Sequence, residues 1–184
     1  MSDQNPWTTL ATRWVYDNPW IAVREDRVLN PGGGEGVYGV VRFKNRAVGV
    51  IPVDDAGHTW LVGQYRYALG HYSWEIPMGG HPVEEPEEDG ALRELREETG
   101  LRAGRLDTLL EVDLSNSVTD ERGVVYLARE LTPGPTDFDE TEAIELRRLP
   151  FDEALAMALD GRIRDTLSVA GLCALGLRRQ TFGL

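Results

Sequence analysis

Hydrophobic and polar positions alternate over short stretches along most of the chain, a pattern that predicts strands joined by turns. Within residues 12–28, two extended segments are interrupted by Asn18-Pro19. A third extended segment follows the glycines at 32–34. We expect these three segments to form a small antiparallel ribbon ahead of the main body.

The remainder of the chain predicts strands with helices between them. Further strands are predicted at 47–53, 59–67, 74–78, 106–114, 124–131 and 143–149. The turn at 54–57 predicts that the first two of these pair as a hairpin. One helix is expected from Pro150 to Gly161, and another is expected to be capped by Asp165 and to run to about Arg179. This order predicts an α/β sandwich with a central mixed sheet.

A strongly acidic segment at 79–101 (GGHPVEEPEEDGALRELREETGL) contains one more predicted helix. Pro86 suits the first turn of that helix, and Gly100 suits the residue just after its end. Leu92 and Leu95 are expected to form its apolar side.

Three carboxylates of this helix predict a metal site. Glu94 and Glu98 lie one turn apart and Glu97 lies beside them, so we expect the three to share one side of the helix, opposite the apolar side. The alternative is a solvated helix in which Arg93 and Arg96 offset the acids. Unpaired carboxylates repel one another, whereas hard oxygen donors suit Mg²⁺ or Mn²⁺.

Composition limits the possible partners and compartment. With 184 residues, 31 acids and 19 bases, the chain can form one well-packed domain and carries a net charge of −12. That charge argues against nucleic acid as the partner. The sequence shows neither a signal-peptide pattern nor an apolar stretch of the ~18 residues that a membrane span needs. We therefore expect a cytoplasmic protein without a membrane partner. Cys173, the single cysteine, is expected to be a buried and inert thiol.

The acidic segment resembles the Nudix box of the Nudix hydrolases. Five residues separate Gly79 from Glu85, and seven more separate Glu85 from Arg93. The run Arg-Glu-Leu-x-Glu-Glu-x-Gly-Leu then ends at Leu101, so every defined position of the box is filled. The resemblance extends over 47–177. It implies a Nudix-type α/β/α sandwich, with an N-terminal ribbon at 1–45 and a hydrolase domain at 46–184.

Nudix hydrolases split a nucleoside diphosphate linked to another group, by attack of water on phosphorus with Mg²⁺ or Mn²⁺ assisting. Carried over by position, the resemblance implies these metal ligands: Met78 through its carbonyl, Glu85, Glu94, Glu97 and Glu98. Glu97 is alternatively an organiser of the attacking water. Arg93 is expected to hold the loop and orient the glutamates.

Outside the box, the chain resembles the ADP-ribose pyrophosphatases and related nucleoside diphosphate sugar hydrolases. Glu121 matches a substrate-binding or metal-proximal glutamate of that group. Glu140 and Glu142 match an acidic loop that supplies a metal ligand or the general base, although acidic loops are often simply solvated. Arg66 matches an arginine near the pyrophosphate, the alternative being an ordinary arginine on a strand edge.

Aromatic residues of the N-terminal part are candidates for stacking on a base, namely Trp20 and Tyr38, although such residues also serve as core. In the family the ribbon often exchanges between two subunits, and exchange would bury the tryptophans Trp7, Trp14 and Trp20. The resemblance therefore implies a homodimer. The segment 114–118 lacks the proline expected of the ADP-ribose-specific subgroup, which favours a broader substrate range such as GDP-mannose or ADP-glucose.

The leading prediction is metal-dependent hydrolysis of a nucleoside diphosphate sugar (ADP-ribose, GDP-mannose or similar) to a nucleoside monophosphate and a sugar phosphate. One alternative is a dinucleoside polyphosphate hydrolase. Another is a sensor that binds a nucleotide sugar without cleaving it. Such a sensor would be expected to lose box glutamates, and this chain keeps Glu94, Glu97 and Glu98.

Overall fold

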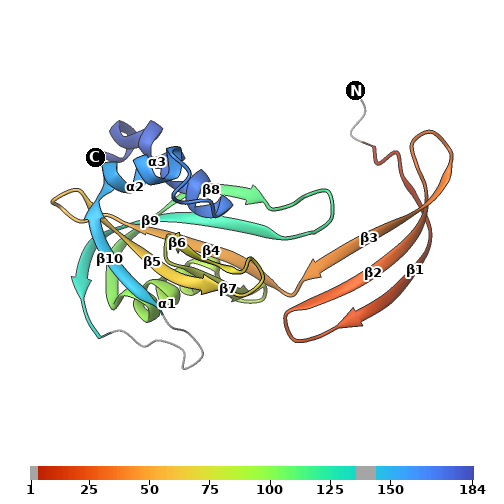
Figure 1. Cartoon of the computed structure of the whole chain (residues 1–184), viewed down its shortest axis with the longest axis horizontal. Coiled ribbons are helices and arrows are strands. Elements are labelled where there is room, and N and C mark those ends of the chain that lie inside the picture. Colours follow the sequence, from red (N-terminus) through yellow and green to blue (C-terminus); the bar gives the residue numbers. More distant parts are fainter. Residues whose placement is uncertain (1–3, 136–143) are drawn as a thin grey trace.

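A three-stranded ribbon projects from the body of the molecule (Figure 1). The computed structural model describes residues 4–135 and 144–184, so Glu140 and Glu142 lie outside the described residues. The ribbon strands are β1 (Thr8–Asp17), β2 (Ile21–Leu29) and β3 (Glu35–Phe43). Both neighbouring pairs are antiparallel, which confirms the predicted N-terminal ribbon.

The body contains two sheets. The mixed sheet has the order β7-β4-β9-β8, formed by Met78–Pro82, Asn45–Pro52, Arg122–Pro133 and Leu101–Asp113. The second sheet has the order β10-β5-β6, formed by Glu145–Pro150, His58–Arg66 and His71–Glu75. β4 and β9 are parallel, and the other neighbours are antiparallel. The predicted mixed sheet is therefore confirmed.

The expected hairpin between 47–53 and 59–67 is wrong. β4 pairs with β7 and β9, whereas β5 pairs with β6 and β10, and an isolated bridge between Val53 and Thr59 joins their near ends. β4 reads as a buried strand because residues of both its faces, such as Val50 and Ile51, are fully buried. Such a strand belongs at the centre of a sheet, with partners distant in sequence on both edges.

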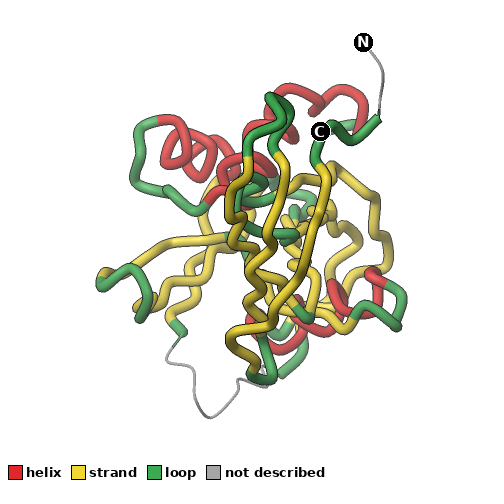
Figure 2. The backbone as a smooth tube through the Cα atoms, turned by 90° about the vertical axis from the view of Figure 1, so that its right-hand side faces the viewer, coloured by secondary structure: helices red, strands yellow, loops and turns green. Residues whose placement is uncertain are grey.

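Helices cover both faces of the mixed sheet, and both views show them on opposite sides of the strands (Figure 1, Figure 2). They are α1 (Glu87–Thr99), α2 (Phe151–Leu159) and α3 (Thr166–Phe182). Leu95 of α1 packs in one apolar cluster with Val48 and Val124 of the sheet. Leu167 of α3 packs in the other cluster with Ile51. The predicted α/β/α arrangement is confirmed.

The predicted helix ends are largely confirmed. Gly100 follows α1 with a φ of 70°, and Pro86 immediately precedes the first helical residue. The Asp165 side chain caps α3 by accepting a hydrogen bond from the Ser168 N–H. Cys173 is half-buried on α3, not fully buried as predicted.

In the part of the chain that the structure describes, the helices lack the combination of length and apolar character that a membrane crossing needs. The cytoplasmic location stays a prediction.

Candidate active site

The side of α1 that faces the sheet carries two of the box carboxylates. Leu95 and Ala91 are fully buried one turn apart, and Glu94 and Glu98 form the next row with 9% and 3% exposure. Leu92 is 37% exposed, so the predicted apolar side formed by Leu92 and Leu95 is wrong for Leu92. The carboxylates therefore lie between helix and sheet, beside Leu95 and not opposite it. Sequence spacing correctly grouped them on one side of the helix, but the prediction that this side lies opposite Leu95 is wrong.

Glu98 is joined to the start of β7. The backbone N–H of Met78 donates a hydrogen bond of 2.9 Å to Glu98 Oε2. This bond fixes one carboxylate oxygen relative to the strand. The bond involves the Met78 N–H and not its carbonyl, so the carbonyl as a metal ligand stays a prediction.

Glu94 lies against the backbone of the first box glycine. A Cβ atom at Gly79 would lie less than 3.0 Å from the Glu94 carboxylate, closer than real Cβ atoms approach. Any other residue at 79 would push the carboxylate away. Packing against Glu94 is thus a sufficient reason for glycine at this position.

Arg93 binds two of the box glutamates and the preceding strand. Its guanidinium lies 2.8 Å from Glu94 Oε1 and 3.3 Å from Glu97 Oε2, and it donates to the Gly80 carbonyl at 3.0 Å. Arg96 donates to the other Glu97 oxygen at 3.1 Å. The geometry fits a residue that orients glutamates. A catalytic role of Arg93 or Glu97 stays a prediction.

The loop between β7 and α1 is held by a buried histidine. His81 is fully buried, and its Nε2 lies 2.8 Å from the Glu85 carbonyl oxygen. Because a carbonyl accepts, Nε2 must carry a proton. Nδ1 is buried without a hydrogen-bond partner among the described residues, and it faces Gly90 of α1. The Glu85 side chain is exposed in this loop.

The predicted set of metal ligands suits a hard cation, because all of its side-chain donors are carboxylates. Among residues 4–135 and 144–184, however, no group of three or more histidine, cysteine, aspartate or glutamate side chains converges in a way that could hold a metal ion. The ligand assignment therefore stays a prediction for its whole set: Met78, Glu85, Glu94, Glu97 and Glu98.

An ion pair that the sequence analysis missed lies beside Glu98. Arg66, at the end of β5, donates from Nε to both oxygens of Glu75 at 3.0 and 3.1 Å and forms a further short contact through Nη2. Glu75 is 2% exposed. Hydrogen bonding to Glu75 raises the pKa of Arg66, and the negative charges of Glu75, Asp165 and Glu98 act in the same direction. A glutamate inside the apolar segment WEIPM was the available signal.

Glu121 and Asp165 extend this group. Burial raises the pKa of Glu121, and the negative charge of Asp165 raises it further. Asp165 also acts on Arg66, as noted above. Asp165 therefore acts on both Arg66 and Glu121. We call this electrostatic group the charge cluster, and its members are Arg66, Glu75, Glu98, Glu121 and Asp165. Sequence analysis predicted Arg66, Glu98 and Glu121 as site residues and gave Asp165 only a capping role.

The predicted stacking residues lie on the ribbon. Trp20 is 69% exposed at the turn between β1 and β2. The Tyr38 hydroxyl donates to the Ser117 carbonyl at 2.6 Å, and its ring packs edge-on against Trp7. Tyr38 thereby fastens the ribbon to the loop between β8 and β9. Stacking of Trp20 or Tyr38 on a base stays a prediction.

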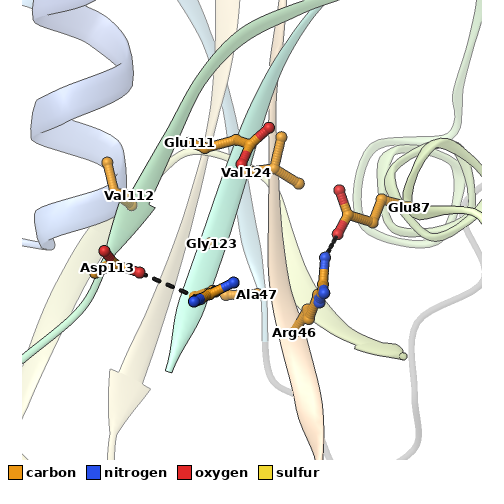
Figure 3. Close-up of a pocket in the computed structure, with 9 residues that line it drawn as sticks. Arg46, Ala47, Glu87, Glu111, Val112, Asp113, Gly123 and Val124 are labelled. Atoms are coloured by element: carbon orange, nitrogen blue, oxygen red, sulfur yellow. Dashed lines mark hydrogen bonds and ion pairs between the residues drawn. The ribbon is translucent and has the colours of Figure 1, made fainter. Parts of the chain in front are cut away.

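A separate cavity of ≈ 300 Å³ opens near the N-terminus of α1 (Figure 3). Arg46 is paired with Glu87 there, and Arg122 lies 3.4 Å from Asp113. The residues lining this cavity include none of the predicted site residues. We take the box carboxylates and the charge cluster as the candidate active site, outside this cavity.

Comparison with known proteins gives two family matches in succession. Residues 7–41 match the nucleoside diphosphate sugar hydrolase N-terminal domain, and residues 43–168 match the NUDIX domain. The chain is 33% identical over 175 residues to an ADP-ribose pyrophosphatase of Mycobacterium tuberculosis, covering 94% of this chain and 84% of that protein. It is 40% identical over 77 residues to a GDP-mannose pyrophosphatase of Yersinia pestis, covering 40% and 38%.

A solved structure described as an ADP compounds hydrolase superposes with a TM-score of 0.87. The match covers 100% of this chain and 99% of that one at 22% sequence identity. At this identity the match shows that the two proteins share a fold.

Proposed function

This chain belongs to the Nudix hydrolase family, and we propose that it hydrolyses the pyrophosphate of a nucleoside diphosphate sugar in a metal-dependent reaction. The products are a nucleoside monophosphate and a sugar phosphate. The observation that carries the proposal is the pair of buried carboxylates, Glu94 packed on Gly79 and Glu98 bonded to Met78. ADP-ribose and GDP-mannose are the substrate types that the names of the relatives suggest.

The charge of the site supports the metal requirement. Carboxylates of the box and the charge cluster outnumber the nearby guanidiniums, and Arg66 and Arg93 are both paired with glutamates. A polyanionic substrate would be repelled by such a surface. We assign the metal to Glu94 and Glu98. When bound, Mg²⁺ or Mn²⁺ supplies charge neutralisation and Lewis-acid assistance at the pyrophosphate.

Groups of the protein itself hold the side chains of the site in position. The Met78 N–H and Arg93 hold Glu98 and Glu94 in place, which reduces the reorganisation needed during reaction. Glu75 fixes the Arg66 guanidinium, which we propose faces the phosphates. We propose that Glu97 organises the attacking water.

The general base lies, in this proposal, in the acidic loop that contains Glu140 and Glu142, outside the described residues. We assign Glu121 of the charge cluster to substrate binding, together with Trp20 and Tyr38.

A product analysis tests the reaction. ADP-ribose, GDP-mannose, ADP-glucose and UDP-glucose are incubated with the protein in Mg²⁺ and, separately, in EDTA. We expect release of nucleoside monophosphate in the presence of Mg²⁺ and none in EDTA. Turnover that survives EDTA would contradict the metal requirement. Absence of turnover on all four would favour dinucleoside polyphosphates or a sensor role.

A further inference from the structure

The first turn of α3 is bonded to a segment 92 residues earlier in the chain. Ser168 is fully buried, and its Oγ donates to Asp165 Oδ1 at 2.7 Å. The same Oγ accepts a hydrogen bond of 3.0 Å from the Ile76 backbone N–H. Asp165 Oδ1 also accepts from the Ser168 N–H at 2.7 Å. The residues that cap α3 are thus hydrogen-bonded to the backbone at Ile76, between β6 and β7.

The segment that donates this bond, 75–78, contacts a different element at every residue. Glu75 holds Arg66 of β5. The Pro77 carbonyl accepts from the Val50 N–H of β4 at 2.8 Å, and the Met78 N–H donates to Glu98 of α1. Two of these ties end on groups of the candidate active site. The bond between Ile76 and Ser168 connects segment 75–78 to α3.

Packing leaves little freedom at this attachment. A Cβ atom at Gly49 of β4 would lie 2.9 Å from Ile76 Cδ1 and 3.1 Å from Leu167 Cδ2. Ile76 and Leu167, which precedes Ser168, therefore both lie on the backbone of Gly49. Because interiors are close-packed, a movement of α3 here would be transmitted to 75–78. The charge of Asp165 also reaches Arg66 and Glu121 and contributes to the raised pKa of each.

We propose that Ser168 and Asp165 are positioning residues of the active site, which fix segment 75–78 so that Glu75 holds Arg66 and Met78 holds Glu98. The inference rests on the proposed hydrolase function. A displacement of about 1 Å of catalytic groups can lower the rate on the order of 10²-fold. We therefore expect loss of either residue to lower turnover in addition to stability.

Ser168→Ala is the direct test, because it leaves the buried Ile76 N–H without its acceptor. We expect kcat to fall at least roughly 10-fold with KM changed much less. Asp165→Asn keeps an acceptor oxygen for the cap, so it should retain most of the activity that Asp165→Ala loses. The matched control is Leu175→Val. It creates a cavity beside the same helix and is chosen to give a similar loss of thermal stability.

Amide hydrogen exchange supplies a readout that needs no turnover. Ser168→Ala should speed exchange at Met78 as well as at Ile76, while Leu175→Val should leave Met78 at the wild-type rate. If both the exchange at Met78 and kcat in Ser168→Ala match the Leu175→Val control, the positioning role is wrong. A wild-type protein that cleaves no sugar nucleotide would instead refute the proposed function, and exchange at Met78 would still decide the positioning.

Discussion

Gly90 occupies the interior of α1, where glycine is unfavourable. Its hydrogen faces the buried His81 ring, and a Cβ atom there would lie less than 3.0 Å from that ring. His81 in turn holds the Glu85 carbonyl. The two residues therefore form a matched pair, because the loop before α1 can be fastened by an imidazole only where the helix leaves room for one.

The first prediction concerns Gly90→Ala. Helix propensity alone would stabilise the protein by about 1 kcal/mol. We expect destabilisation instead, because the new methyl group would displace His81. Urea unfolding at pH 7.5 measures the sign. In a His81→Ala background the same Gly90→Ala change should become stabilising. A gain in stability from Gly90→Ala in the wild-type background would show that His81 does not constrain the helix.

The second prediction concerns Glu121 and pH. Burial raises its pKa above the ordinary value of 4.5, so the folded state binds the proton more tightly than the unfolded state. The resulting stabilisation is complete below pH 4.5 and is lost as pH rises through the folded-state pKa. Glu121→Gln should therefore be more stable than wild type at pH 7.5 and nearly equal to it at pH 4. Denaturant unfolding at both pH values is the measurement. An equal difference at the two pH values would contradict the role of ionisation.

Single-residue roles could be predicted only where local spacing determines them. The box spacing placed Glu94 and Glu98 together on α1, and both are indeed held at β7. The Arg66–Glu75 pair joins two strands, and the bond between Ser168 and Ile76 joins segments 92 residues apart. No local pattern encodes such contacts, so these partners emerged only from the fold.

At the scale of elements, the sequence predicted most strands and helices but not their partners. Alternation and turn residues are local signals, and they located the ribbon, α1 and α3. Pairing of β4 with β9 joins segments far apart in sequence, and the turn at 54–57 wrongly indicated a hairpin. The orientation of α1 was missed for a related reason. Glu94 is 9% exposed and Leu92 is 37% exposed, so the apolar residues of α1 alone did not indicate its buried side.

The third prediction concerns the ribbon as an element. β1 is exposed over its whole length and presents Trp14 at 52% exposure at the open edge of a three-stranded sheet. Exposed apolar surface on a sheet edge favours association, and we propose that it does so in a homodimer. Light scattering after size exclusion should give twice the chain mass of 20.5 kDa.

Trp14→Asp should shift that dimer to the monomer mass. The control is Leu177→Asp, which changes another large and exposed hydrophobic residue, on α3. Dissociation by Trp14→Asp alone would support the ribbon as the interface. A wild-type mass of 20.5 kDa, or equal effects of both variants, would contradict it.

At the scale of the whole molecule, the fold brings a helix, two sheets and the start of a second helix to one place. α1 supplies the carboxylates, β5 and β6 supply the Arg66–Glu75 pair, and α3 supplies the cap that holds 75–78. We propose a division into a ribbon at 1–45 and a hydrolase domain at 46–184. In this account the substrate and the metal meet where these elements converge.

The most direct test is turnover of Glu98→Gln on the best sugar nucleotide of the panel in Mg²⁺. Glutamine keeps an acceptor oxygen for the Met78 N–H but removes the charge, so the variant should fold. The control is Glu88→Gln, an exposed acid of the same helix. We predict a loss on the order of 10²–10⁴ in kcat for Glu98→Gln, the size expected when metal assistance is removed, and wild-type turnover for Glu88→Gln. A folded Glu98→Gln variant with wild-type turnover would contradict the account.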